Sequence, residues 1–99
     1  MQEAILPNII GFDWDAANQH KNWHKHQVSS AECEEIFFNI PLLLHEDTAH
    51  SINEKRMLAL GQTDNGRRLF IAFTTRKQRI RIISARDMHK KERAIYEKT

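Results

Sequence analysis

Four short runs rich in β-branched, leucine or aromatic residues constrain the fold of this chain most. They span residues 42–45, 55–62, 68–75 and 79–85. The connections between the last three runs are very short, and short connections join antiparallel neighbours. Asn65-Gly66 is a strong hairpin signal because both residues tolerate positive φ, and Arg76-Lys77-Gln78 suggests a second hairpin. The pattern therefore predicts a largely antiparallel sheet.

Local capping signals predict helices before this sheet. Asp15 can accept hydrogen bonds from the free N–H groups of a polar surface helix over residues 16–26. Ser29 and Glu32 form a capping box, and apolar residues then recur at helical spacing, which predicts a second helix over residues 30–38.

A third helix is expected after residue 85, with Asp87 as a possible N-cap and with Met88, Ile95 and Tyr96 on one apolar stripe. A short strand over residues 9–13 completes the order β-α-α-β-β-β-β-α. The fold class is therefore α+β, with helices packed on a largely antiparallel sheet.

Length and composition indicate one folded domain over residues 1–99. The chain is 40% hydrophobic and 28% charged, which is ordinary for a folded protein and too apolar for a disordered tail. Its single cysteine, Cys33, excludes an intrachain disulfide and is best interpreted as a small core residue. No signal peptide or membrane-length apolar run is visible, so we expect a cytoplasmic protein with no membrane contact.

Charge is divided unevenly along the chain. Residues 1–50 contain two lysines and eight acidic residues, whereas residues 51–99 contain thirteen Lys or Arg and five acidic residues. Such asymmetry is typical of a basic face that meets phosphates, although an ordinary solvated surface is the simpler explanation.

The strand over residues 79–85 concentrates this positive charge. Strict alternation would place Ile80, Ile82, Ser84 and Arg86 on one face, and Arg79, Arg81, Ile83 and Ala85 on the other. The arginines could be the solvated side of a half-exposed strand. However, further cations lie on the neighbouring elements and favour a phosphate-binding groove. These cations are Arg67, Arg68, Arg76, Lys77, Lys90, Lys91 and Arg93.

Glu92 falls on the stripe of the last helix that should face the sheet. A half-buried carboxylate needs a cation, and a strand arginine could supply it. A structural tether is the favoured interpretation, and a proton-transfer base is the alternative.

Other candidate sites are weaker. His20 and His24 have the i, i+4 spacing with which two imidazoles can reach one metal, but no third ligand is evident, so no metal site is predicted. Lys25-His26 can stabilise the end of its helix or move protons. No nucleophile elbow, P-loop or dinucleotide fingerprint is present, and no cofactor is expected.

Nearly the whole chain resembles the BrnT family of bacterial type II toxin-antitoxin toxins. Phe12-Asp13-Trp14-Asp15 is similar to the family's FEWD opening, and Asn22 with Lys25-His26-Gln27-Val28-Ser29 is similar to its N-x-x-KHGVS segment. The resemblance continues through Glu46-Asp47, His50-Ser51, Glu54, Arg56, Gly61, Gly66-Arg67, RIISAR at 81–86 and Glu92-Arg93. The sequence departs from the family pattern at Asp13, Ala16, Asn18 and Gln27.

The resemblance implies a RelE-like fold and a ribonuclease that arrests growth. It also implies neutralisation by a ribbon-helix-helix antitoxin similar to BrnA, in a complex of two toxins and two antitoxins that binds its own operator DNA.

Under this resemblance the expected cleavage is metal-independent attack of the RNA 2′-OH on the adjacent phosphate, which needs phosphate-binding cations and proton transfer. We expect Arg56, Arg81 and Arg86 at the scissile phosphate, Lys25 or His26 in proton transfer or phosphate binding, and Glu92 orienting an arginine. The expected RNA-positioning residues are Arg67, Arg68, Arg79, Lys90 and Arg93. A non-catalytic RNA- or DNA-binding module and a pure protein-interaction domain are the competing hypotheses.

Overall fold

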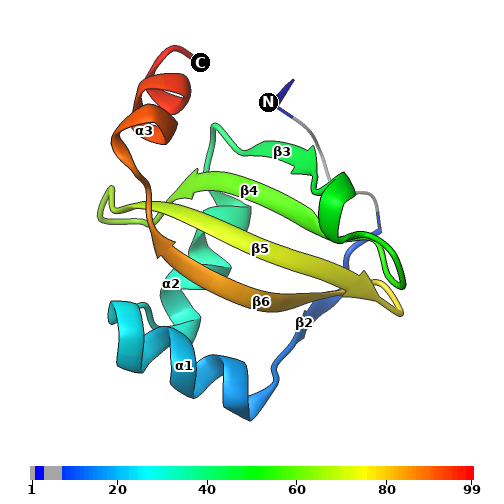
Figure 1. Cartoon of the computed structure of the whole chain (residues 1–99). Coiled ribbons are helices and arrows are strands. Elements are labelled where there is room, and N and C mark those ends of the chain that lie inside the picture. The colour runs from blue at the N-terminus through cyan, green and yellow to red at the C-terminus, as the bar shows by residue number, and fades with distance from the viewer. Residues whose placement is uncertain (1, 4–7) are drawn as a thin grey trace.

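A computed structural model describes residues 2–3 and 8–99 and has one six-stranded sheet with helices on both faces (Figure 1). The strand order is β1-β3-β4-β5-β6-β2. The strands are β1 (Gln2–Glu3), β2 (Gly11–Asp13), β3 (Leu43–Glu46), β4 (Met57–Gln62), β5 (Arg68–Arg76) and β6 (Arg79–Asp87). The helices are α1 (Ala16–His26), α2 (Ser30–Glu35) and α3 (Lys90–Glu97), with 3₁₀ turns η1 (Ile36–Phe38) and η2 (Thr48–His50).

The sheet is antiparallel except for its β2–β6 pair, which is parallel. The predicted α+β class, the four central strands and the three helices are therefore confirmed. The strand β1 was not predicted; it pairs with β3 at the opposite edge from β2.

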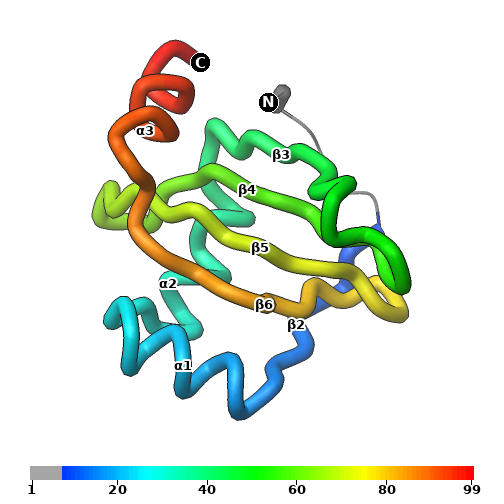
Figure 2. Tube along the Cα trace, in the orientation of Figure 1, coloured from blue at the N-terminus to red at the C-terminus, as the bar shows by residue number. Residues whose placement is uncertain are grey.

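The helices α1 and α2 cover one face of the sheet; in Figure 2, α2 runs behind the strands and α1 lies below β6. The main core lies between these helices and the sheet. Val28, Cys33 and Ile36 pack there against the buried residues of β5 and β6. Gly61 of β4 allows the close approach of η1, because a Cβ at this position would lie 2.8 Å from the Cβ of Ile36.

The third helix, α3, lies on the opposite face and covers only one end of the sheet (Figure 1). Met88 and Tyr96 pack there with Leu43 and Leu60 in a second, smaller core. The predicted stripe is wrong at Ile95, which is 47% exposed, because the short helix turns this position away from the sheet.

One local prediction is wrong, and both predicted hairpins are confirmed. Asp87 does not cap α3, because β6 continues through it and His89 is the N-cap. The Asn65-Gly66 hairpin joins β4 to β5, with positive φ at Gly66 (84°). The second hairpin joins β5 to β6 through the two-residue turn Lys77-Gln78, where both residues have positive φ (51° and 64°).

A β-bulge breaks the strict alternation expected for β6. Ala72 of β5 pairs with Ser84, whereas the next residue, Phe73, pairs with Ile82, so Ile83 is the extra residue. As a result Ile82 and Ala85 both face the main core, and both are essentially inaccessible to solvent. The predicted grouping of Ile82 with Ser84 and Arg86 on one face is therefore wrong.

No helix in the described part of the chain is long and apolar enough to cross a membrane.

Candidate nucleic-acid interface

The surface of interest is the face of the sheet opposite α1 and α2, where α3 leaves part of the strands uncovered. We call it the open face. Strand register places Phe70 beside Arg86, Ala72 beside Ser84, and Thr74 beside Arg81. Phe70 packs in the second core, so Phe70, Ala72 and Thr74, which alternate along β5, all point to the open face. Paired residues share a face, so Arg86 and Arg81 point to it as well.

Arg56 joins the same face at its far end from α3. It precedes Met57, which packs against the main core, so alternation turns Arg56 the other way. The chain here is held beside β5, since the Thr74 hydroxyl donates to the carbonyl of Lys55 at 2.8 Å. The structure therefore brings Arg56 and Arg81 to one end of the open face and places Arg86 at the end beside α3.

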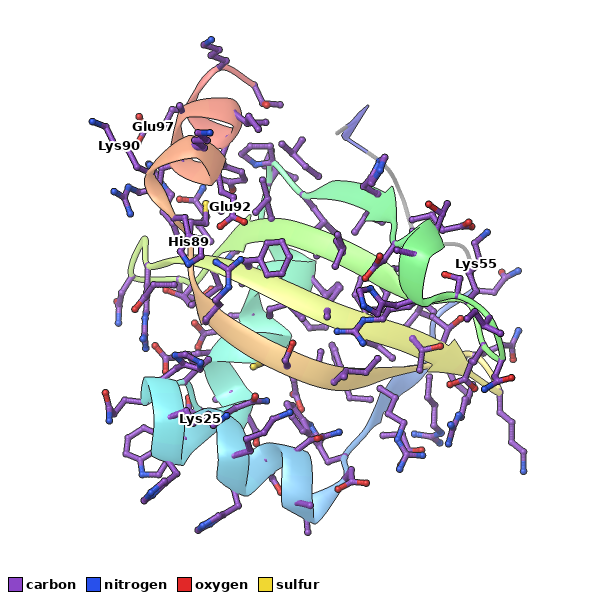
Figure 3. All side chains as sticks on the ribbon, viewed as in Figure 1. Lys25, Lys55, His89, Lys90, Glu92 and Glu97 are labelled. Carbon is purple, nitrogen blue, oxygen red and sulfur yellow. The ribbon has the colours of Figure 1, made fainter. Side chains whose placement is uncertain are left out.

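Arg86 is the most completely fixed of these three arginines. Its Nη1 and Nη2 donate to the two carboxylate oxygens of Glu92 at 2.8 and 3.0 Å, and its guanidinium lies 4.1 Å from the centroid of the Phe70 ring. Figure 3 shows Glu92 projecting from α3 toward the sheet. The expected pairing of Glu92 with a strand arginine is thus present.

Glu92 itself is in an environment that favours its ionised form. The Arg86 hydrogen bonds, and then the backbone N–H of His89 at 2.7 Å, lower the pKa of its carboxyl against an opposing effect of burial. A carboxylate with a lowered pKa is a poor proton acceptor near neutral pH. This geometry supports the tether rather than the proton-transfer base.

Arg81 and Arg56 are held more loosely by acidic residues. Arg81 donates to the Asp15 carboxylate at 3.2 Å and lies 3.8 Å from that of Asp13. Asp15 also caps α1, and the pKa of its carboxyl is lowered by the two cap hydrogen bonds first and by Arg81 second. The Nε of Arg56 is 3.5 Å from the Asp47 carboxylate and makes no hydrogen bond within the described residues.

Arg67 has an internal role that the sequence did not reveal. Its guanidinium bonds to the carboxylates of Asp87 and Glu32 and to the carbonyls of His26 and Gln27, at 2.8 to 3.3 Å. These contacts raise its pKa, with the Asp87 hydrogen bond as the largest cause. Arg67 therefore joins the end of α1, the start of α2 and the end of β6.

Lys25 and His26 are exposed on the last turn of α1, whose end is bonded to Arg67. Figure 3 shows Lys25 on this helix. Asp87 is part of this junction, and its pKa is lowered chiefly by the Arg67 hydrogen bond and more weakly by the charges of His26 and Arg93. The structure thus places Lys25 and His26 nearer to Arg86 than to Arg56.

The remaining predicted RNA-binding residues are spread around the open face. Arg68 pairs with Glu97 and lies over the Tyr96 ring, while Arg93 donates to the Met88 carbonyl at 2.8 Å. Arg79 and Lys90 are exposed at opposite ends of the face. Their positions differ too much for a single contact point.

One cluster was not singled out as functional from the sequence. In the β3–β4 loop, residues 47–56, the Nδ1 of His50 lies 2.9 Å from the Asp47 carboxylate that also faces Arg56. Ser51 donates to the Asp47 carbonyl at 2.6 Å and accepts from the Arg56 N–H at 3.0 Å. The Asp-x-x-His spacing was the available signal, but it needs a folded loop to bring Arg56 alongside.

Two other features offer no competing site. A shallow hollow of about 410 Å³ is lined by Phe38, Ile40, Asp64 and neighbouring polar residues, with no basic side chain among them. The His20 and His24 rings stack at 5.7 Å, but no group of three or more potential metal-binding side chains occurs among residues 2–3 and 8–99.

Comparison with solved structures identifies a similar fold in the ribonuclease toxin BrnT from Brucella abortus. The match has a TM-score of 0.63 at 17% sequence identity and covers 82% of this chain and 99% of that one. At this identity the similarity establishes the fold. No curated protein matched the sequence.

The family comparison goes further than the fold. A family described as "Ribonuclease toxin, BrnT, of type II toxin-antitoxin system" matches residues 14–92, which is most of the chain. The protein is therefore a type II toxin by class, and it belongs to the BrnT family.

Proposed function

We propose that this chain is a single-domain endoribonuclease that cleaves RNA in the cytoplasm without a metal ion and so arrests growth. The cut would occur by attack of a 2′-OH on the adjacent phosphate, leaving a 2′,3′-cyclic phosphate. Membership of a ribonuclease toxin family supports the general activity. The arrangement of cations on the open face supports the mechanism.

The observation that carries the proposal is the bulge at Ile83. In a regular strand Arg81 and Arg86, five positions apart, would lie on opposite faces. The bulge places both on the open face, where Arg56 also lies. Their partners on β5, Thr74 and Phe70, are four positions apart, so at about 3.3 Å per residue Arg81 and Arg86 are separated by roughly 13 Å, a span that suits a bound strand rather than one phosphate.

The proposed roles follow from how each arginine is held. Arg56 and Arg81 have the looser contacts and would bind the scissile phosphate, where they stabilise the developing negative charge. Arg86, fixed by Glu92, would hold a neighbouring phosphate of the same strand. Lys25 and His26 would extend this path at the sheet edge as phosphate contacts.

Four further cations would position the RNA backbone with little sequence preference. They are Arg68, Arg79, Lys90 and Arg93. Arg67 is excluded from this surface in our proposal, because its hydrogen-bond donors are already engaged within the protein.

The partner would be a ribbon-helix-helix antitoxin similar to BrnA, in a complex of two toxins and two antitoxins that binds operator DNA. The family description supports an antitoxin of some kind. Size-exclusion chromatography with light scattering on the co-expressed pair, followed by a promoter-binding assay, tests the composition and the DNA binding.

Activity is tested with purified toxin, freed of antitoxin, and a defined single-stranded RNA in EDTA. We expect fragments that end in 2′,3′-cyclic phosphate, and loss of cleavage in Arg81→Ala. The matched control is Lys98→Ala, which removes an exposed cation at the chain end. Cleavage that requires added metal, or that persists in Arg81→Ala, would contradict the proposed mechanism.

A non-catalytic module on the same face gives a different result. It would bind the RNA without cutting it, and its expression would not stop growth. In both cases affinity should fall steeply as salt rises, because binding releases counterions from the phosphates.

A further inference from the structure

The β3–β4 loop holds a histidine in an arrangement suited to proton transfer. His50 Nδ1 lies 2.9 Å from Asp47 Oδ2. In the neutral imidazole this contact favours the hydrogen on Nδ1, because a carboxylate oxygen accepts, and it leaves the lone pair on Nε2. The His50 side chain is 64% exposed whereas that of Asp47 is 15% exposed, so the orienting group is sheltered and the imidazole is accessible.

The loop around this pair is itself pinned. The N–H of Asp47 donates to the Arg56 carbonyl at 2.8 Å, and the Ser51 hydroxyl connects the Asp47 carbonyl to the Arg56 N–H. The two ends of the loop are thereby held together. The orientation of His50 depends on a fixed backbone rather than on a free surface turn.

The same loop places His50 at the end of the open face that holds Arg56 and Arg81. Asp47 faces both His50 and the Arg56 guanidinium. Glu54, further along the loop, pairs with Arg76, and the pKa of Glu54 is lowered mainly by that pair and slightly by the charge of Arg81. Arg56 and Arg81 are therefore both neighbours of this loop.

We propose that His50, oriented by Asp47, is the general base that accepts the proton of the attacking 2′-OH. This inference rests on the proposed ribonuclease function. The 2′-oxygen forms a bond to phosphorus and the bond from phosphorus to the 5′-oxygen breaks. The 5′-oxygen leaves with the electron pair, and the His50 imidazolium returns the proton to it through a water molecule. Arg56 stabilises the negative charge that develops on the phosphate.

The test compares His50→Gln with the wild type on a single-stranded RNA that contains every dinucleotide step. We expect the cleavage rate to fall by about 100-fold or more, the range typical of general base catalysis, with unchanged RNA affinity. The control is His20→Gln, an exposed histidine on α1, which should cleave at the wild-type rate.

Two readouts separate catalysis from a structural role. Added imidazole should restore part of the activity of His50→Ala. The pH profile of cleavage by His50→Ala should lack the fall in rate at acidic pH that the wild type shows. Asp47→Asn should lower the rate without changing RNA affinity, because an amide no longer fixes the reactive tautomer. The thermal unfolding midpoint of His50→Gln should match that of the wild type.

Each other outcome overturns the inference in a recognisable way. A wild type that cuts RNA beside a His50→Gln that cuts equally well refutes the role of His50 and leaves the proposed function intact. Loss of activity with weaker RNA binding or a lower unfolding midpoint assigns His50 a structural role. A wild type that does not cut RNA refutes the proposed function itself.

Discussion

Glu92 and Arg86 form a two-point ion pair, with nitrogen–oxygen distances of 2.8 and 3.0 Å, that fastens α3 to the end of β6. The carboxylate also accepts from the His89 N–H and so caps the helix that it tethers. The guanidinium also lies over the Phe70 ring, so Arg86 is held through its two terminal nitrogen atoms and through one face. Glu92 therefore both caps the start of α3 and holds the side chain of Arg86 on β6.

Replacing Glu92 should reveal this double role. Glu92→Gln removes the charge that Arg86 faces, so we expect a loss of about 1 to 2 kcal/mol in the free energy of unfolding. Glu97→Gln, on the same helix, breaks a more exposed pair and should cost less, about 0.5 kcal/mol. Urea denaturation measures both variants, and equal losses would contradict the assigned difference.

Arg67 is expected to matter for stability more than any other arginine. Arg67→Ala removes a donor from two carboxylates and two carbonyls at once, which should cost about 2 to 3 kcal/mol. Arg79→Ala, at an exposed position, should change stability by less than about 0.5 kcal/mol. Thermal and urea unfolding provide the comparison. A stable Arg67→Ala protein would show that the junction contributes little.

Acid should destabilise the fold. Glu32, Asp87 and Glu92 all have carboxyl pKa values that folding lowers. Their contribution to stability is complete above the unfolded-state pKa values and is lost as pH falls through the folded-state values. We expect a constant free energy of unfolding from neutral pH down to about pH 5 and a decline below it. Glu92→Gln should flatten this decline, and an unchanged slope would contradict the assignment.

Cys33 should resist thiol reagents while the protein is folded. Its side chain is fully buried, and burial is the largest cause that raises the pKa of its thiol to about 12. Iodoacetamide at mildly alkaline pH should therefore label the chain only after unfolding in guanidinium. Rapid labelling of the folded protein would show that the main core opens locally. Mass spectrometry distinguishes the two results.

Much of the fold could be predicted because its signals are local. The N-cap at Asp15 and the bounds of α1 at residues 16–26 agree with the structure, as does the capping box of Ser29 and Glu32. These contacts form within a few residues of each other, so the sequence pattern contains them directly. Strand β1 has only two residues, and so short a segment offers no periodicity to detect.

The sequence by itself determined the class of fold, the family resemblance and the basic character of the second half. Tertiary structure decided which cations lie on the same face of the sheet. The bulge at Ile83 exists only relative to the partner strand β5, yet it moves Arg81 to the face of Arg86. The grouping of His50, Asp47 and Arg56 likewise requires a closed loop. Periodicity records the neighbours of a residue along the chain, whereas a site depends on neighbours that only register and loop closure bring together.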